Sequence, residues 1–279
     1  MRLTITGSGG FRRTPRPGCD CEVCQEAREQ GFQRLGPSMF IHDQNILFDA
    51  PEEIAAELEN AGISRIDHLF FTHWHPDHTM GARILEIMNT KWSEKMEWRM
   101  VAKHRTQVYM PPLVYGEIME RFGAFFKFWE HIGIAEVHEA EGQVRCGDLI
   151  IEPVVMKSMH RTVTHSTIYI IQSGGKKIIY APCDITPFPW DDRFQGCDMM
   201  ILQTGWYGPR MAERAEKGPH CEISMDEILE IAREYAPGEI ILTHIGDESE
   251  LLLPDLKALE EKFAEPNIRF AFDGMELEI

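Results

Sequence analysis

Short apolar runs bounded by turn residues recur along most of the chain and predict a protein rich in β-strands. Glycine, proline, asparagine or aspartate stands near the ends of many of these runs, which is typical of strand boundaries. The predicted strands are Leu3–Thr6, Ser38–His42, Asn45–Asp49, Asp67–Thr72, Gln107–Met110, Leu149–Val155, Ser166–Gln172, Lys176–Tyr180, Met199–Gln203, Glu239–Leu242, Ile268–Phe272 and Glu276–Ile279.

Helix signals lie between these strands. Pro51 suits the first position of a helix, whose apolar stripe runs from Ile54 and which Gly62 ends. Ser224 and Glu227 have the spacing of a capping box, and that helix is predicted to stop at Pro237. Two more helices are predicted, over Pro112–Phe122 and Pro254–Phe263.

The order of these elements predicts one α/β domain of layered sheets over residues 1–279. Residues 11–37 combine prolines, glycines and three cysteines, so we expect an irregular excursion there. Residues 84–139 give the weakest pattern and are treated as an insertion, with an aromatic cluster formed by Phe125, Phe126, Phe128 and Trp129.

Composition narrows the class of protein. The 279 residues are 43% hydrophobic and 26% charged, with a formal net charge of −17. No stretch approaches the ~18 apolar residues of a membrane-spanning helix, and the start lacks the pattern of a signal peptide. Because affinity for nucleic-acid backbones depends on clustered Lys and Arg, the acidic balance argues against such a partner. Seven cysteines in a chain without secretory features indicate a reducing, cytoplasmic location.

The most informative segment is His73-Trp74-His75-Pro76-Asp77-His78, directly after an apolar strand. Imidazole and carboxylate groups are the usual ligands of divalent metals such as zinc. Since Pro76 argues against a regular helix, we expect these ligands on a loop, where His73 and His75 reach one metal and Asp77 and His78 a second. A surface loop that is merely rich in histidine is the alternative.

This run resembles the signature of the metallo-β-lactamase superfamily, and other residues follow in the order typical of that family. The resemblance implies a four-layer αββα sandwich and two active-site metals, zinc or manganese. It assigns the metal ligands His73, His75, His160, Asp77, His78, Asp184 and His244, with Asp49 bracing the ligand loop. His160 is preferred over His165 by its distance from the strand that follows. The implied activity is hydrolysis through a hydroxide that bridges the two metals, with Asp77 and Asp184 positioning it.

A second candidate metal site is the cluster Cys19-Asp20-Cys21 and Cys24, in which three thiols lie within six residues. Such spacing suits a tetrahedral structural zinc, with free surface thiols as the alternative. The cluster resembles the accessory phosphodiesterases of the bacterial carbon–phosphorus lyase pathway and the hydrolase-like proteins of pyrroloquinoline quinone biosynthesis. In those phosphodiesterases a histidine completes the site, whereas this chain has Asp247, a carboxylate that can also bind zinc.

His220, in Pro219-His220-Cys221-Glu222, resembles the proton donor of the same phosphodiesterases and the catalytic histidine of tRNA 3′-processing endonucleases. The resemblance therefore implies a phosphodiesterase acting on a small sugar or nucleotide phosphodiester, cyclic ones included, with His220, Asp77 and Asp184 as catalytic residues. An RNA-processing endonuclease and a non-hydrolytic metal scaffold of cofactor biosynthesis are the alternatives.

Three basic residues near the start, Arg12, Arg13 and Arg16, admit two interpretations. They would meet a second phosphate of the substrate, or they would form an ordinary solvated surface. The expected partner is a small molecule, with no membrane and no nucleic acid, and the sequence leaves open whether the chain forms a homodimer.

Overall fold

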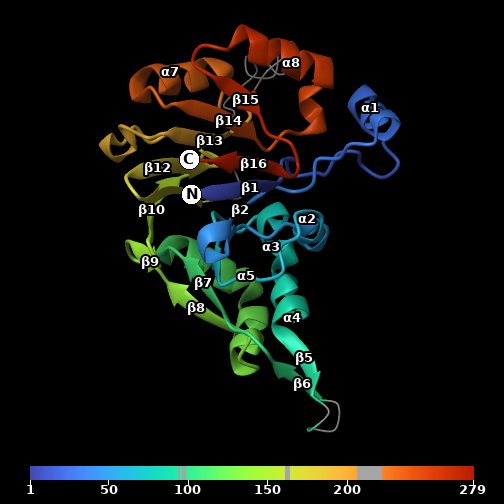
Figure 1. Cartoon of the computed structure of the whole chain (residues 1–279), viewed down its shortest axis with the longest axis vertical. Helices are drawn as coiled ribbons and strands as arrows, with labels where there is room; N and C mark the ends of the chain where they lie inside the picture. Colours follow the sequence, from blue (N-terminus) through green and yellow to red (C-terminus); the bar gives the residue numbers. More distant parts are fainter. Residues whose placement is uncertain (94, 96–98, 161–163, 206–221) are drawn as a thin grey trace.

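The structure of the chain is a computed structural model that describes residues 1–93, 95, 99–160, 164–205 and 222–279. Two seven-stranded sheets form its centre, with helices packed outside them and a two-stranded hairpin projecting at one end (Figure 1). The carboxyl ends of parallel strands in both sheets carry the histidine and aspartate residues singled out in the sequence.

The first sheet contains mainly the early part of the chain. Its strands are, in spatial order, β16 (Met275–Glu278), β1 (Arg2–Gly7), β2 (Ser38–Ile41), β3 (Ile46–Phe48), β4 (His68–Phe70), β7 (Thr106–Met110) and β8 (Ala135–Glu139). The pairing is antiparallel from β16 to β3 and parallel from β3 to β8. Strands from both ends of the chain therefore share this sheet, because β16 pairs with β1.

The second sheet contains the later strands. In spatial order these are β15 (Ile268–Phe270), β14 (Glu239–Thr243), β13 (Met199–Gln203), β12 (Lys176–Ala181), β11 (His165–Ser173), β10 (Leu149–Lys157) and β9 (Val144–Cys146). Strands β12 to β15 are parallel, and β9 to β12 pair antiparallel.

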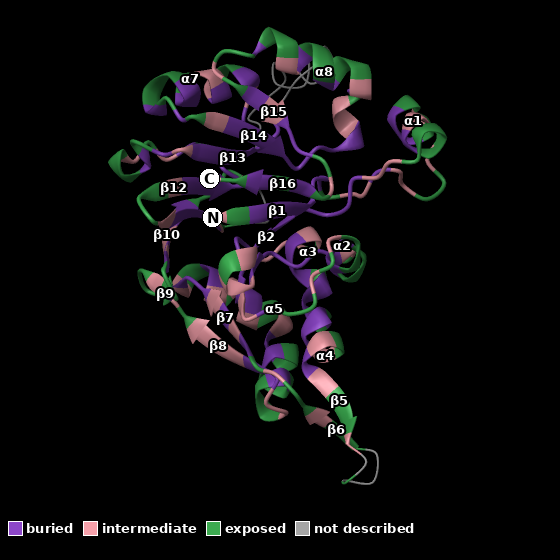
Figure 2. Ribbon diagram, viewed as in Figure 1, coloured by how far each residue is buried: buried purple, intermediate pink, exposed green. Residues whose placement is uncertain are grey.

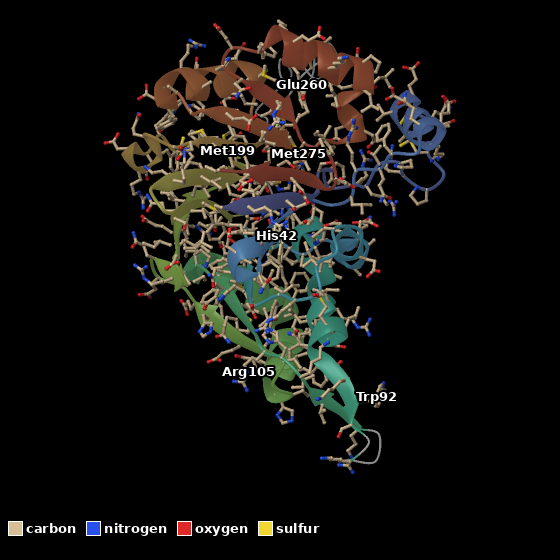
Figure 3. All side chains as sticks on the ribbon, viewed as in Figure 1. His42, Trp92, Arg105, Met199, Glu260 and Met275 are labelled. Carbon is tan, nitrogen blue, oxygen red and sulfur yellow. The ribbon has the colours of Figure 1, made fainter. Side chains whose placement is uncertain are left out.

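Alternate side chains of the central strands point to opposite sides of each sheet, as the period of a strand requires. Met199 and Ile201 of β13 join the core between the sheets, whereas Met200 and Leu202 face the outer helices. Figure 3 marks Met199 and Met275, which belong to different sheets and to the same inner core. The sheets are therefore packed face to face, and the central strands are buried on both sides (Figure 2).

Helices close the two outer faces. The first sheet packs against α2 (Ile54–Asn60), α4 (Ile84–Asn89) and α5 (Pro112–His131), and the second against α7 (Met225–Tyr235) and α8 (Leu253–Lys262). The layers follow the order helix, sheet, sheet, helix, which confirms the αββα sandwich predicted from the sequence. Within the described ranges no helix is both long and apolar enough to cross a membrane.

Two early elements differ from the prediction. Residues 11–37 are not irregular throughout, because helix α1 (Glu22–Gln30) occupies the proline-free stretch that ends at Gly31 in the left-handed conformation. Helix α2 begins at Ile54 and not at Pro51, since the Pro51 carbonyl oxygen accepts from Ile54 N at 3.0 Å.

The region 84–139 is largely integral to the sandwich. Strands β7 and β8 complete the first sheet, and only the hairpin of β5 (Thr90–Ser93) and β6 (Arg99–Ala102) projects, with Trp92 exposed on it (Figure 3). Helix α5 continues to His131 and contains the four residues of the predicted aromatic cluster, which do not form one buried group. Phe126 and Trp129 extend the buried stripe begun by Val114 and Ile118, whereas Phe125 and Phe128 are exposed.

Candidate metal centre

The expected ligands lie at strand ends of the two sheets. His73 and His75 follow β4, Asp184 follows β12, and His244 follows β14. Asp49, Asp184 and His244 adopt positive φ angles of 61°, 52° and 61°. Few residues other than glycine take this conformation, and its cost is often accepted at functional sites. The backbone thus turns sharply where each strand ends and directs these side chains to one edge of the sandwich.

The histidine loop itself differs from the expectation. Pro76 does not prevent a helix, because it occupies the first position of the single-turn helix α3 (Pro76–Thr79), where its missing N–H is not needed. His73 and His75 precede this turn, while Asp77 and His78 lie within it. The prediction that all four ligands lie on a loop was therefore wrong for the last two.

The side chains form two groupings. In the first, His73 Nε2 and His75 Nδ1 each lie 3.4 Å from Asp184 Oδ2. The ring of His160 lies edge-on to that of His75, with 4.7 Å between their centroids. In the second, Asp77 Oδ2 lies 3.5 Å from both His78 Nε2 and His244 Nε2. These are the two ligand groups that the sequence predicted, brought together from distant segments.

The donor atoms fit divalent metals. Five of them are buried without a hydrogen-bond partner in the part of the chain that the structure describes: His73 Nε2, Asp77 Oδ2, His78 Nε2, Asp184 Oδ2 and His244 Nε2. Buried polar atoms without partners are rare because each loses its hydration, so five facing one another indicate an absent ligand common to them. Imidazole nitrogen and carboxylate oxygen are the atoms that zinc and manganese take.

Asp49 orients the histidine-rich segment through hydrogen bonds to Thr72 and His78. Its carboxylate accepts from Thr72 N, Thr72 Oγ1 and His78 Nδ1, each at 2.8 Å. A carboxylate on the second ring nitrogen fixes which nitrogen of His78 faces the site and makes it a better ligand. This placement agrees with the bracing role that the family resemblance implied for Asp49.

Burial and neighbouring charges determine the protonation states of the histidine ligands in the metal-free site. It lowers the pKa of His75 to about 4 despite the Asp77 carboxylate, and it lowers the pKa of His73 well below its ordinary value, with a further contribution from His78. Both rings are therefore neutral at pH 7, the form that binds metal. For His244, burial is outweighed by Asp77 and Glu222, which raise its pKa to about 9. Metal binding at His244 must therefore displace a proton.

His165, the alternative to His160 as a ligand, belongs to neither grouping. His165 Nδ1 pairs with Glu117 Oε1 of helix α5 at 3.0 Å, so it is directed away from the two groupings. His160, in contrast, lines the same cavity as His75 and Asp184. The position of His160 is thus the one compatible with a ligand.

A cavity of about 320 Å³ opens over both groupings. Besides the ligands it is lined by Phe11, Cys183 and Glu222, none of which was predicted as a site residue. Gln203 donates a hydrogen bond to Glu222, and burial, with Asp184 nearby, raises the pKa of this glutamate to about 7. The only sequence signal for Glu222 was its place after His220 and Cys221, which themselves lie outside the described residues.

The cysteine cluster is also assembled. The ligand atoms of Cys19, Cys21, Cys24 and Asp247 all lie within 4.8 Å of one another, with Cys21 Sγ 3.7 Å from Asp247 Oδ2. Asp247 Oδ1 is buried without a hydrogen-bond partner in the described chain. Three thiols and a carboxylate form a donor set of the kind that structural zinc takes.

Two of the three arginines near the start, Arg12 and Arg16, contact the cysteine cluster through Asp247. Arg16 Nε donates to Asp247 Oδ2 at 2.8 Å, and Arg12 Nη2 lies 3.7 Å from Asp247 Oδ1. Arg13 Nη2 donates to Gln33 Oε1 at 3.3 Å. Arg12 and Arg16 are thus paired with Asp247 and not freely solvated, and the Arg12 guanidinium also lies 4.3 Å from the centroid of the Phe11 ring.

Comparisons with known proteins agree with this fold. Residues 44–245 match the family model described as the β-lactamase superfamily domain. The structure is similar over the full chain to a diphosphatase from the PhnP family (TM-score 0.73, 20% identity, 97% of that chain covered). It is likewise similar to Zn(2+)-bound PqqB from Methylobacterium extorquens (TM-score 0.77, 16% identity, 100% of both chains covered).

One curated relative is closer in sequence. The chain is 31% identical over 285 residues to a protein named octanoyltransferase from Porphyromonas gingivalis (strain ATCC BAA-308 / W83). The match takes in 99% of this chain and 51% of that protein, so the chain spans about half of its length.

Proposed function

The chain belongs to the β-lactamase superfamily, and from that premise we propose that it is a metal-dependent phosphodiesterase acting on small substrates. Members of this superfamily are mostly metal-dependent hydrolases. The observation that carries the proposal is the set of five buried donor atoms without partners, divided between two groupings that face one cavity.

When bound, two metals at such a site neutralise charge on phosphoryl oxygens and generate a strong nucleophile from water at neutral pH. The residues of the first grouping, together with His160, would hold one of them, and those of the second grouping the other. Asp184 stands at the first grouping with its pKa raised by burial, and metal charge would favour its ionised form. Asp49 keeps His78 in one ring orientation throughout.

A small substrate suits the surroundings. A cavity of about 320 Å³ lies at the lower end of the range for small-molecule sites. The net charge of −17 disfavours long polyanions such as RNA. Phe11 lies on the cavity wall and is 55% exposed. The Arg12 guanidinium covers one face of its ring, and the other face would contact the sugar or base of a nucleotide phosphodiester, cyclic ones included. The similar structure from the PhnP family is named a diphosphatase, and this name also favours a substrate that contains phosphate.

His220 is proposed as the proton donor to the leaving alkoxide. The support comes from the sequence, because the residue is outside the described chain, and from Glu222, two residues later, which lines the cavity. Imidazole near pH 7 suits this proton transfer.

A second candidate, hydrolysis of an acyl ester or thioester, rests on the relative named octanoyltransferase. The metal chemistry that serves phosphoryl transfer also polarises a carbonyl group, so the same side chains could support it. The sequence around His160 counts against this candidate, since it lacks the Gly-His-Thr-x-Gly run typical of thioester hydrolases in this superfamily.

The test is a parallel assay of the purified chain loaded with Zn²⁺ or Mn²⁺. Bis(p-nitrophenyl) phosphate, a 2′,3′-cyclic nucleotide, octanoyl coenzyme A and a tRNA precursor are compared by kcat/KM. The proposal requires the two phosphodiesters of low mass to be the best substrates. Faster turnover of the thioester or of the tRNA precursor would replace it with that activity, and no turnover of any substrate would support a metal scaffold.

A further inference from the structure

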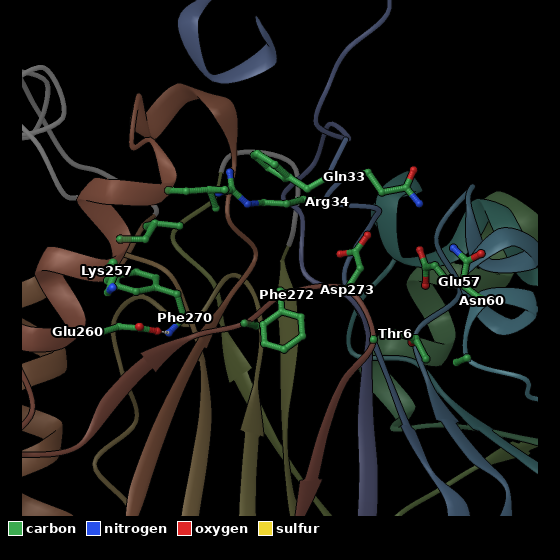
Figure 4. Close-up of a pocket in the computed structure, with 16 residues that line it drawn as sticks. Thr6, Gln33, Arg34, Glu57, Asn60, Lys257, Glu260, Phe270, Phe272 and Asp273 are labelled. Atoms are coloured by element: carbon green, nitrogen blue, oxygen red, sulfur yellow. Dashed lines mark hydrogen bonds between the residues drawn. The ribbon is translucent and has the colours of Figure 1, made fainter. Parts of the chain in front are cut away.

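A second, larger cavity lies away from the metal centre. It has a volume of about 600 Å³, within the range of small-molecule sites, and shares no lining residue with the cavity over the histidines. Helices α2 and α8, residues 32–34 and the turn after β15 enclose it (Figure 4). Its lining includes a set of apolar side chains: Phe32, Leu253, Leu256, Phe270 and Phe272.

Arg34 is the unusual residue of this cavity. Its backbone is fixed by two hydrogen bonds of 2.8 Å with Thr14, and its side chain extends toward α8, where Lys257 lies (Figure 4). The residue is only 3% exposed, and its two terminal nitrogens, Nη1 and Nη2, have no hydrogen-bond partner among the described residues. The guanidinium lies over the Phe32 ring, 5.2 Å from its centroid, a contact that neither satisfies its N–H groups nor neutralises its charge. A buried guanidinium without a hydrogen-bonding or ionic partner is costly, so an anion is the missing element.

The nearest acidic side chains are engaged elsewhere. Asp273 accepts from Ser8 N at 2.9 Å, Ser8 Oγ at 2.7 Å and Leu35 N at 2.8 Å. Glu26 accepts from Leu253 N at 3.0 Å and from a side-chain amide of its own helix. Both attract Arg34 through space, but among the described residues neither forms an ion pair with it. Arg34 therefore provides positive charge without direct neutralisation.

We propose that this cavity binds an amphipathic monocarboxylate, with its carboxylate on Arg34 and its hydrocarbon chain against Leu256 and Phe270. The planar fork of an arginine matches the two oxygens of a carboxylate. The aromatic and aliphatic walls match a chain of medium length. The site is separate from the metal centre and does not rest on the function proposed for it.

The charges around the cavity favour one negative charge over two. Glu57, Glu260 and Asp273 line it alongside Arg34 and the exposed Lys257. Burial raises the pKa of Glu57 well above its ordinary value, with contributions from Asp273 and Glu53, and it raises the pKa of Asp273 to about 6. A phosphate dianion would meet these carboxyl groups with only one buried cation to balance it.

The test is calorimetric titration of the metal-loaded full chain with octanoate. We expect saturable binding of one octanoate per chain, no displacement by inorganic phosphate, and no comparable binding of octanol. Arg34→Met, which removes the charge and keeps much of the volume, should weaken binding at least 30-fold. Asp184→Asn, at the metal centre, should leave the affinity unchanged.

A second variant keeps the proposal testable if Arg34→Met does not fold. Leu256→Trp fills the cavity with a larger apolar side chain and should abolish octanoate binding while circular dichroism remains native. The proposal fails if octanoate does not saturate the protein, if Arg34→Met binds as tightly as wild type, or if octanol binds equally well. It also fails if Asp184→Asn abolishes binding, because the carboxylate would then lie on the active-site metals.

Discussion

The histidine-rich centre and the cysteine cluster are both fit to hold metal, and they are built in opposite ways. The histidine centre draws its ligands from the ends of strands in both sheets and leaves a cavity above them. The cysteine cluster takes three ligands from six consecutive residues and one, Asp247, from the far end of the chain. Catalytic zinc sites keep a position open, whereas structural ones use every position for protein ligands.

One loop joins the two clusters. His244 belongs to the histidine centre and Asp247 to the cysteine cluster, and only Ile245 and Gly246 separate them. Gly9 pairs with Ile245 as an isolated parallel bridge, and Gly9 N donates to Leu35 O at 2.6 Å. A Cβ atom at position 9 would lie 2.5 Å from that oxygen, so only glycine permits this contact. The comparison teaches that metal at the cysteines would brace a loop that delivers a ligand to the other centre.

The largest effect should come from removing a ligand of the histidine centre. Asp184→Ala is expected to lower kcat/KM for bis(p-nitrophenyl) phosphate at least about 10³-fold, or about 4 kcal/mol, because it leaves the first grouping without its carboxylate. The variant His75→Ala should behave alike. Asp148→Ala, at an exposed turn, is the matched control. More than a tenth of wild-type kcat/KM in either ligand variant would contradict the assignment of two metals.

His220→Ala should have the next largest effect, and one that depends on the substrate. For a diester with a poor alkoxide leaving group we expect a loss of about 10²–10⁴-fold, the range typical of a missing general acid. For bis(p-nitrophenyl) phosphate the loss should be far smaller, because p-nitrophenolate needs no proton. Elemental analysis should find both active-site metals still bound to this variant.

Two other results would reassign His220. Loss of one metal would make it a ligand, and equal slowing of both substrates would give it a structural role. The same pair of substrates should be applied to His165→Ala, which pairs with Glu117 and is expected to show no dependence on the leaving group.

Much of the fold could be read from the sequence because its determinants are local. Apolar runs located most strands of both sheets but missed β8 and β9. Ser224 with Glu227 marked the start of α7, where the structure has both hydrogen bonds of the capping box. The ligand run at residues 73–78 was visible for the same reason, since four donors are adjacent in the chain.

The errors came from reading residue types without their position in an element. Pro76 was taken to exclude a helix, although proline is well suited to the first position that it occupies. Helix α1 was missed because the prolines and glycines around it dominated the composition of residues 11–37. Long-range contacts explain the rest: nothing near Phe11 or Arg34 in the sequence indicates that each lines a cavity.

The variant Cys21→Ser tests the second region of the comparison, the cysteine cluster. The purified variant should contain about one metal equivalent less than wild type and melt roughly 10 °C lower, or about 3–5 kcal/mol, because metal binding to the cysteines contributes to folding. Its folded fraction should keep most of the wild-type kcat. The exposed neighbour Asp20, changed to Asn, should alter neither quantity. Equal metal content in variant and wild type would argue that the thiols bind none.

The smallest effect should come from the ionisation of Asp273, which changes the stability of the fold. Its carboxylate accepts hydrogen bonds from Ser8 and Leu35, next to the loop that carries His244 and Asp247. Burial raises its pKa to about 6 from an ordinary value of 3.8, so its protonated form favours the folded state. That stability is fully present below about pH 4 and is lost as pH rises through 6, by up to about 3 kcal/mol.

The variant Asp273→Asn cannot ionise and should lose less stability than wild type between pH 4 and pH 6. Urea unfolding across this interval measures the difference between the two chains at each pH. A constant difference would show that Asp273 titrates normally and that its three hydrogen bonds offset its burial.

The pairing of β1 with β16 has a consequence for how the protein is made. Arg2 lies opposite Glu278 and Ile5 opposite Met275, so β1 is synthesised long before the strand that pairs with one of its edges. Until then one edge of β1 presents unpaired backbone groups, which favour association with other strands. The remaining strands of the first sheet, from β1 to β8, can pair before β16 is made. A nascent chain stalled before residue 275 should therefore expose β1 to chaperones that a finished chain no longer recruits.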